Sequence, residues 1–351
     1  MLISEIDRVV QETARKLLQV SVPPVKYWLL VDTLGREESD PLVQRTIAEC
    51  KAYPPRVRLI EKLRPDGTWP ISKARKSAED AGPGPPIGWT YVTMLRNLQL
   101  LEDCYTDSSE GFISAALEKI LSWQTKGGYI LGPKHDIFPL PHYNGYAVRN
   151  LFIYGMGEDL RVKKLADWLL NTQRHDGGWV IPYQQDVKYL PEYRHMGVDR
   201  FLEHVRSGDT PRSDPKGFRD IPSCIWTTMM VIRGLARGNE YRQRKEILSG
   251  ADFFLDRFFK KNWHESYYHS EKYWTQLKYP PYPGCGISAL YLLTILGYGP
   301  GDERMDKPIR WLLGARHSDG FWWQSDRPHV QKDQWITGFA IDILNRYAKN
   351  Q

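Results

Sequence analysis

Two side chains that could exchange a proton with a ligand stand at the starts of apolar, helix-like segments. His142 lies just before segment 144–155, and Asp333 lies just before segment 334–348. An imidazole and a carboxyl group are common general acids and bases, and a surrounding apolar site tunes their pKa values for that work. We therefore take His142 and Asp333 as candidate catalytic residues. For His142, which follows a proline, a simple role in loop hydrogen bonding stays open.

Aromatic side chains gather at the same segment starts, where the sequence reads IGWTY, HYNGY, SCIWTT, KYPPYPGCG and KDQW. Apolar walls with sparse hydrogen-bonding groups are typical of a site for a hydrophobic ligand, or for stacked sugar rings. Helix N-termini converging there would also favour an anionic head group. The candidate ligand-binding residues are Trp89, Tyr143, Asn144, Trp226, Tyr282 and Trp335, and core packing is the alternative role for their aromatic rings.

We expect neither a metal site nor a cofactor. The chain has four cysteines, which lie far apart with no Cys-x-x-Cys pair and no histidine at zinc-finger spacing. This pattern indicates neither a structural zinc site nor a disulfide framework, so reduced thiols are expected. The acidic run EDCYTD (102–107) is the nearest approach to a magnesium site, and a helix end followed by a solvated loop explains it better.

Composition excludes several classes of protein. Among 351 residues, 13% are aromatic, and the formal net charge is +6. The basic clusters are short and no nucleic-acid-binding motif accompanies them, so we expect no nucleic-acid partner. No window reaches the roughly 18 apolar residues that a membrane helix requires, and the N-terminus is amphipathic. We expect a soluble, cytoplasmic protein, with peripheral contact to a membrane left open.

The chain repeats a pattern of two helices and a turn. Turn-like tetrads occur at 66–69, 126–129, 176–179, 260–263 and 319–322, and each follows an amphipathic, helix-like segment. After most tetrads comes an apolar segment, at 88–101, 144–155, 223–236, 284–297 and 334–348. A helix that is apolar around most of its circumference must be surrounded by protein. The pattern predicts an all-α fold of five to six helical hairpins, with apolar helices inside and amphipathic helices outside.

Such hairpins can close into a ring, an α/α toroid, or stack as an open solenoid. The closed ring is favoured because the inner segments are apolar on both flanks and the units are few. We expect one domain over 1–351, with a helical lead-in at 1–40 and a long inserted loop at 182–220. A loop of that length is typical of a lid, a binding element or a disordered insertion.

Four of the five tetrads combine a glycine with an aromatic residue, and the fourth, KKNW (260–263), has the aromatic residue without a glycine. A glycine after the last helical turn takes the left-handed conformation that ends the outer helix and reverses the chain. The aromatic ring that follows can then pack between neighbouring hairpins. We assign this packing role to Trp69, Trp179, Trp263 and Trp322.

The stretch NTQRHDGGW (171–179) resembles the QW repeat of squalene and oxidosqualene cyclases, which the prenyltransferase and squalene-oxidase repeat superfamily shares more loosely. The full Gln-to-Trp spacing is met once, by Gln173 and Trp179. Stretches 23–70 and 272–297 look similar to bacterial and archaeal squalene-cyclase-like toroid proteins. This resemblance implies the α/α toroid and, as an expectation, a terpenoid ligand and an isomerase-type cyclisation.

The chemistry of that family is matched poorly. Cyclases that protonate an alkene or epoxide carry Asp-x-Asp-Asp-Thr at the start of an inner helix, and of those carboxylates only Asp333 has a counterpart here. Prenyltransferase β subunits bind zinc through an Asp-x-Cys pair, but Pro283 stands where that aspartate would precede Cys285. We therefore expect a squalene-cyclase-like protein that binds a hydrophobic, isoprenoid-like molecule without the usual proton donor, and catalysis itself stays open.

Two other classes of function stay open. Toroids with similar glycine turns occur in polysaccharide lyases, which use an arginine or lysine base, and the sequence offers Arg149, Arg194 and Arg233. A sugar-binding or lyase-like toroid is therefore one alternative. The other is a non-catalytic scaffold that binds a partner protein on its rim.

Overall fold

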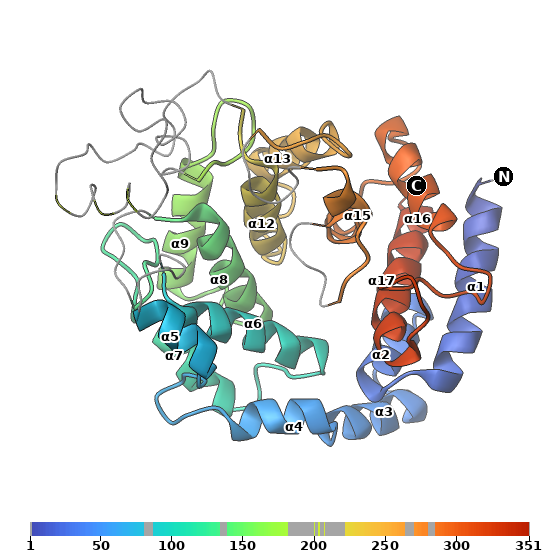
Figure 1. Cartoon of the computed structure of the whole chain (residues 1–351), viewed down its shortest axis with the longest axis horizontal. Coiled ribbons are helices and arrows are strands. Elements are labelled where there is room, and N and C mark those ends of the chain that lie inside the picture. Colours follow the sequence, from blue (N-terminus) through green and yellow to red (C-terminus); the bar gives the residue numbers. More distant parts are fainter. Residues whose placement is uncertain are drawn as a thin grey trace. The chain divides into compact units, whose positions relative to one another are not determined.

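The computed structural model describes residues 2–80, 87–133, 139–181, 222–263, 270–279 and 285–350, together with Arg200, Glu203 and Ser207. Helices form the regular structure of these residues (Figure 1), and their one strand-like pairing is an isolated bridge between Gln124 and Ile130. The all-α prediction is confirmed. The predicted loop at 182–220 lies outside the described residues except for those three positions, and Tyr282 lies outside them too.

The chain forms two compact units, each built from separate stretches of sequence. Unit 1 comprises Met1–Val57, Asp103–Thr106 and Phe254–Gln351, and unit 2 comprises Arg58–Glu102 and Asp107–Phe253. The prediction of a single domain over 1–351 stays a prediction. Among the described residues, no helix is long and apolar enough to cross a membrane.

The five apolar segments are helices close to the predicted bounds. In unit 2 they are α6 (Trp89–Asp103, whose last residue belongs to unit 1), α8 (Pro141–Ile153) and α12 (Ile225–Leu235). In unit 1 they are α15 (Gly286–Ile295) and α17 (Val330–Lys349). Most of their residues are buried, as their composition requires.

Five of the remaining helices of the described residues overlap the amphipathic segments that precede the predicted tetrads. Unit 2 has α5 (Lys73–Asp80), α7 (Phe112–Leu121), α9 (Leu160–Asn171) and most of α13 (Lys245–Leu255), and α4 (Pro54–Glu61) spans the unit boundary. Unit 1 has α1 (Leu2–Val20), α2 (Pro23–Trp28), the π-helical turn η1 (Leu29–Thr33), α3 (Pro41–Lys51), α14 (Lys272–Thr275), the 3-10 turn η2 (Glu303–Met305) and α16 (Asp306–Gly314). The five that overlap the amphipathic segments are α4, α7, α9, α13 and α16.

Three tryptophans after the glycine turns are buried, as the sequence predicts. Trp69, Trp179 and Trp322 are at most 2% exposed. Each indole Nε1 donates a hydrogen bond of 2.7 to 2.8 Å to a carbonyl oxygen in the preceding helix region, those of Leu59, Leu169 and Leu312. The glycine two positions earlier has a positive φ in each turn. The turn therefore directs the indole back onto the helix that it ends.

In the second turn the buried position belongs to Ile130. The prediction placed the tetrad at 126–129, which would put Tyr129 in the tryptophan position. Gly128 is the residue with positive φ, at +96°, and its N–H donates to the carbonyl of Thr125. The same bond joins Gly177 to Arg174 in the third turn. Two positions after Gly128 comes Ile130, which is fully buried, so the predicted tetrad starts one residue too early.

The fourth predicted tetrad, at 260–263, is wrong as well. Trp263 is partly exposed, whereas Trp274 is fully buried and its Nε1 donates to the carbonyl oxygen of Lys260 at 2.8 Å. The Trp274 ring packs on Phe258 with 4.4 Å between centroids. Trp274 lies in α14 (Lys272–Thr275), well beyond the predicted tetrad, so a search at fixed spacing selects the wrong indole.

In two of these turns, a glutamine side chain hydrogen-bonds both to the turn and to the next outer helix. Gln173 Nε2 donates to the carbonyl oxygens of Gly177 at 2.7 Å and of Glu246, in α13, at 2.6 Å. Gln124 Nε2 does the same with Gly128 at 2.7 Å and with Arg161, in α9, at 2.8 Å. The Gln-to-aromatic spacing, which the sequence shows once, therefore recurs in the second turn with Ile130 in the aromatic position.

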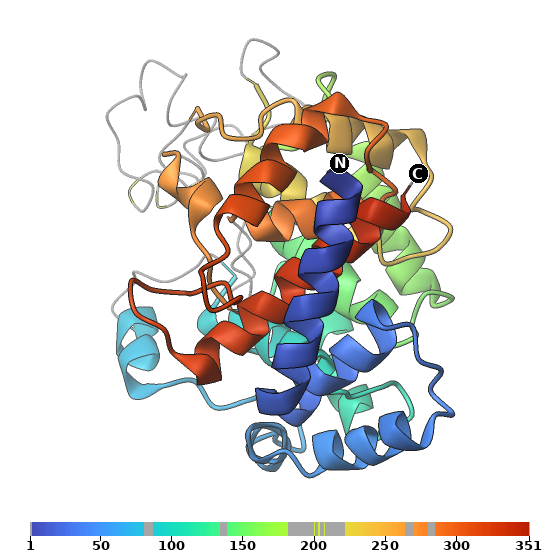
Figure 2. The ribbon, with the colours of Figure 1, turned by 90° about the vertical axis from the view of Figure 1, so that its right-hand side faces the viewer.

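The last turn is tied to the first helix. Thr13 Oγ1 donates to the carbonyl oxygen of Gly320 at 3.3 Å, and Lys16 Nζ donates to that of Asp319 at 2.8 Å. Figure 2 shows α1 lying across α17, and the two helices are in contact within unit 1. Helix α1 thus contacts the last turn in the way that α13, an outer helix, contacts the third turn. The predicted helical lead-in at 1–40 therefore contributes a helix to the repeating pattern.

Helices α8 and α12 approach closely through two glycines. A Cβ built at Gly145 would lie 2.6 Å from the carbonyl oxygen of Met230, and one at Gly234 would lie 2.1 Å from that of Gly145. Both separations are too short for real atoms, so only glycine permits this crossing.

We expect Gly234→Ala to lower the free energy of unfolding by about 1–3 kcal/mol, because the added methyl group must push the two helices apart. Gly314→Ala is the control, since nothing lies within 4 Å of a Cβ built at the end of α16. That variant should be neutral or more stable by up to about 1 kcal/mol. Urea unfolding of both variants measures the difference, and equal effects would contradict the close approach.

Candidate functional site

Helices α8 and α12 of unit 2 run side by side in the same direction. At their N-terminal ends the ring centroids of His142 and Trp226 are 4.4 Å apart. One to two turns further along, Gly145 meets the backbone of Met230. At their C-terminal ends the charges of Arg149 and Arg233 repel each other. Equivalent positions on the two helices therefore face each other along their length.

On each of the two helices, an aromatic ring near the N-terminus and an arginine near the C-terminus lie on the same face. Trp226 and Arg233 are the two residues of α12 that keep solvent-accessible surface, while its other residues are buried. They are seven residues apart, which places them on the same side of a helix. His142 and Arg149 have the same spacing on α8. The shared face has rings at one end and guanidinium groups at the other, separated by ~10 Å at 1.5 Å rise per residue.

The ring end brings together three of the predicted site residues. His142 is 2% exposed, and its ring lies 4.3 Å from that of Tyr143 and 4.4 Å from that of Trp226. Tyr143 and Trp226 are partly exposed although their helices are otherwise largely buried. Trp89, at the start of α6 in the same unit, is also partly exposed and packs under the Arg75 guanidinium at 4.7 Å. Partly exposed aromatic rings at inner-helix starts form the candidate apolar site.

Both polar atoms of the Asn144 side-chain amide make hydrogen bonds to backbone groups. Its Oδ1 accepts from the N–H of Ile130 at 2.7 Å, and its Nδ2 donates to the carbonyl oxygens of Ile130 and Leu140 at 3.1 and 3.0 Å. Thr228 and Thr337 accept from the N–H of Trp179 and Trp322 in the same manner. The geometry therefore favours turn anchoring over ligand binding for Asn144.

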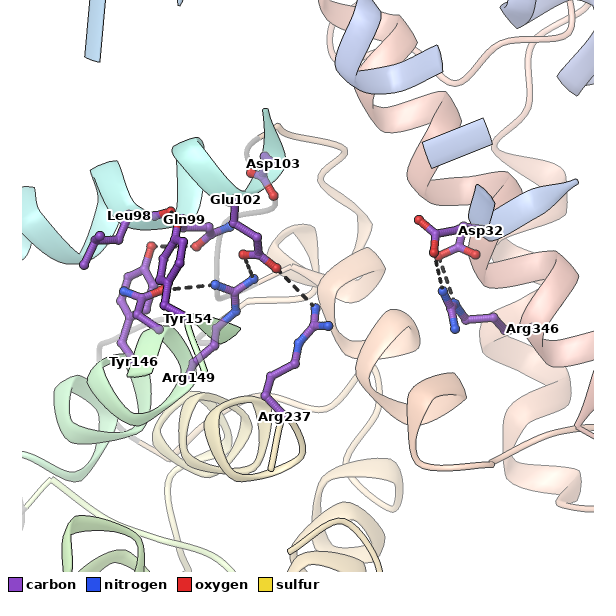
Figure 3. A network of polar contacts seen from close by, with 12 residues as sticks. Asp32, Leu98, Gln99, Glu102, Asp103, Tyr146, Arg149, Tyr154, Arg237 and Arg346 are labelled. Atoms are coloured by element: carbon purple, nitrogen blue, oxygen red, sulfur yellow. Dashed lines mark hydrogen bonds and ion pairs between the residues drawn. The ribbon is translucent and has the colours of Figure 1, made fainter. Parts of the chain in front are cut away.

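The arginine end surrounds a carboxylate of α6 (Figure 3). Arg149 Nη2 lies 2.5 Å from Glu102 Oε2, and Arg237 Nη2 lies 4.0 Å from Glu102 Oε1. Burial acts to raise the pKa of the Glu102 carboxyl, but the charges of Arg149, Arg237 and Arg233 outweigh it and hold the pKa below its ordinary value. Tyr146 hydroxyl donates to Gln99 Oε1 at 2.6 Å beside this group. Within the acidic run at 102–107, Glu102 therefore belongs to this ion pair and not to the loop that follows the helix.

Arg233 differs from its neighbours because it has no hydrogen bond or ion pair with the described residues. Its Nη1 is buried without a partner, as is the Nε of Arg149. Desolvation and then the nearby charge of Arg149 lower the pKa of Arg233 to about 10. A guanidinium stays protonated at neutral pH even so. The arginine end therefore holds positive charge that the described carboxylates do not neutralise.

Asp333 and Trp335 lie in unit 1. Asp333 is 2% exposed, and its two carboxylate oxygens accept from the backbone N–H groups of Gln324 at 2.9 Å and His329 at 2.5 Å. These bonds fix the chain before α17, so the geometry favours a positioning role. Trp335 stacks on Tyr279 with 4.3 Å between centroids and lies edge-on to Trp28 at 5.2 Å. The pairing of Asp333 with His142 stays a prediction.

No group of three potential metal ligands occurs among the described residues. The cysteines are free and buried, and burial raises the pKa of the Cys50 thiol to about 12. Cys285 Sγ lies 3.2 Å from Ser288 Oγ, at the start of an inner helix. In the acidic run, Asp103 accepts from the Tyr279 hydroxyl at 2.8 Å. Cys285 is 2% exposed, as expected of a core thiol, whereas Asp103, Cys104 and Thr106 are at most 7% exposed, so the acidic run is not the solvated loop that the sequence predicts.

The sequence alone indicates only part of the helix face that carries the rings of His142 and Trp226 and the guanidinium groups of Arg149 and Arg233. His142, Tyr143 and Trp226 are candidates by their positions at segment starts, and Arg149 and Arg233 stand out as the arginines of otherwise apolar segments. Their seven-residue spacing was the signal that links the two sets, while nothing in the sequence singles out Arg237. No model of a known protein family matches the chain, and no curated protein matches it closely enough to be identified as a relative. The arrangement of these side chains is therefore the basis for assigning a function.

Proposed function

We propose that the chain is a squalene-cyclase-like α/α toroid whose inner helices bind a hydrophobic small molecule of the isoprenoid class. The observation that carries the proposal is the contact of His142, Tyr143 and Trp226 at the starts of α8 and α12, with the two larger rings left partly exposed on otherwise largely buried helices. Aromatic rings that lie together and keep some access to solvent are typical of the walls of a site for an apolar ligand.

The repeat geometry supports the toroid part of this proposal. The third turn is tied to the next outer helix through Gln173, and the last turn is tied to α1 through Thr13 and Lys16. In a closed ring the last hairpin must pack on the first, and the contact of α1 with α17 within unit 1 is of that kind.

The site supports binding better than cyclisation. A cyclase that begins by protonation needs a carboxylic acid free to donate a proton. The oxygens of Asp333 instead accept hydrogen bonds from two backbone N–H groups. His142 is the remaining candidate for proton transfer, because it lies between two rings of the apolar site. Asp333→Asn should leave ligand binding unchanged if the carboxylate only positions the chain.

We expect Trp226→Ala to weaken the binding of farnesol, a neutral isoprenoid alcohol, by about 10- to 100-fold, since a buried aromatic contact contributes roughly 1.5–3 kcal/mol. Titration calorimetry or equilibrium dialysis measures this. Trp168→Ala is the matched control, because Trp168 is also a partly exposed tryptophan of unit 2 but lies on outer helix α9 against Tyr129.

Two results would contradict the proposal. One is an absence of farnesol binding by the native chain. The other is an equal loss of affinity in the Trp226 and Trp168 variants. Binding of a neutral oligosaccharide in place of farnesol would favour the sugar-binding alternative.

A further inference from the structure

We propose that Arg233 and Arg149, at the C-terminal ends of α12 and α8, form a binding site for a dianionic phosphate-class group. Four observations lead to it. Arg233 and Arg149 lie at equivalent positions of two helices that pack against each other. Arg233 makes no hydrogen bond or ion pair with the described residues, and its buried Nη1 lacks a partner. Arg149 is 3% exposed, and its buried Nε lacks a partner too. Glu102 is the one carboxylate that the described ion pairs place beside these arginines. The inference deepens the proposed function and rests on it for the apolar part of the ligand.

The charge of the cluster defines the chemistry of the ligand. Glu102 pairs with Arg149 and lies 4.0 Å from Arg237, and it makes no ion pair with Arg233. A partly buried cation with a fully buried donor atom, such as Arg233 Nη1, is costly unless a counter-charge is close to it. Planar guanidinium groups donate paired hydrogen bonds that fit the oxygens of phosphate. A group with two negative charges would compensate the positive charges of Arg233 and Arg149, which a neutral hydroxyl cannot do.

The position of the cluster defines how such a ligand would lie. His142 and Trp226 occupy the same helix faces as Arg149 and Arg233, seven residues earlier. A phosphate held by the arginines would therefore place an attached apolar chain toward the rings, ~10 Å away along the helices. This arrangement fits a phosphate ester of a hydrophobic alcohol better than it fits the alcohol itself.

The test compares three probes on the native chain: decyl phosphate, decanol and inorganic phosphate. We expect decyl phosphate to bind at least 10-fold more tightly than decanol, because the charged groups add hydrogen bonds that the alcohol lacks. Its affinity should fall as salt is added, whereas that of decanol should not. Equal affinity for decyl phosphate and decanol would overturn the proposal.

Variants assign the effect to Arg233. Arg233→Met should lower the affinity for decyl phosphate about 10-fold and leave that for decanol unchanged, and Arg233→Lys should recover most of the loss. Arg64→Met is the control, because Arg64 is an exposed arginine of the same unit. Unchanged binding of decyl phosphate by Arg233→Met would overturn the assignment.

The outcomes also separate this inference from the proposed function. If inorganic phosphate binds and is lost in Arg233→Met while decanol and farnesol do not bind, the anion site stands and the apolar site fails. If decanol and farnesol bind but neither phosphate probe shows dependence on Arg233, the anion site is refuted alone.

Discussion

Trp179→Ala is expected to lower the free energy of unfolding by about 3–5 kcal/mol, the range for removing a large buried ring from a packed core. The indole is fully buried, and its Nε1 donates to the carbonyl oxygen of Leu169 at 2.8 Å. A Cβ built at Gly250, on α13, would lie 3.0 Å from the ring. Alanine would therefore leave a cavity between α9 and the next outer helix, and it would remove one hydrogen bond to the Leu169 carbonyl, which still accepts from the N–H and the hydroxyl of Thr172.

Chemical unfolding of the whole chain, followed by far-UV circular dichroism, measures this loss. Trp168→Ala again serves as the control, and it should cost less than about 1 kcal/mol because the Trp168 ring is partly exposed on α9. Trp179→Phe should fall between the two, since it retains much of the ring and loses the hydrogen bond. Similar losses at Trp168 and Trp179 would contradict the role of the turn tryptophans in joining hairpins.

The glycine turns show what periodicity can and cannot predict. The predicted packing role is confirmed for Trp69, Trp179 and Trp322, because each is buried and is the second residue after the glycine with positive φ. The second turn was read one residue early because KGGY contains two glycines, and only the backbone hydrogen bonds show which one reverses the chain. The fixed spacing selects Trp263 instead of Trp274, because the buried indole here comes from the short helix α14 and not from the tetrad.

The inner helices were predicted closely because their composition leaves few choices. A segment such as 223–236, apolar on all sides, has to be a buried helix or strand, and its length favours a helix. Composition does not show which side of the helix keeps access to solvent. Trp226 and Arg233 are on that side of α12, and this depends on where α8 packs through Gly145 and Gly234.

The candidate catalytic residues show a second limit of sequence reasoning. A carboxylate at the start of an apolar helix is compatible with acid catalysis and with capping of the chain, and the residue type is the same for both. In the structure Asp333 holds the backbone at Gln324 and His329. The sequence pattern does not reveal these two hydrogen bonds, because they depend on how the loop before α17 packs against the start of the helix.

The final prediction concerns two neighbouring arginines whose removal should have opposite effects on stability. Arg149→Met is expected to lower the free energy of unfolding by about 3 kcal/mol, because it leaves the Glu102 carboxylate without its closest cation. Arg233→Met is expected to raise it by about 1–2 kcal/mol, because it removes a poorly compensated cation beside Arg149 and adds apolar volume. Urea unfolding at pH 7 measures both.

Titration and a double variant test the physical cause. The pKa of Glu102 lies below its ordinary value in the folded chain, so its ion pair stabilises the fold above the unfolded-state pKa and is lost as pH falls through the folded-state pKa. The deficit of Arg149→Met should therefore shrink in acid, and Glu102→Gln should restore part of it at pH 7. The pKa of Arg233, lowered to about 10, has the opposite consequence: its cost is fully present at neutral pH and is relieved as pH rises through that value. If Arg233→Met were instead destabilising by as much as Arg149→Met, Arg233 would have a counter-charge in the folded chain, and the case for a bound anion would fail with it.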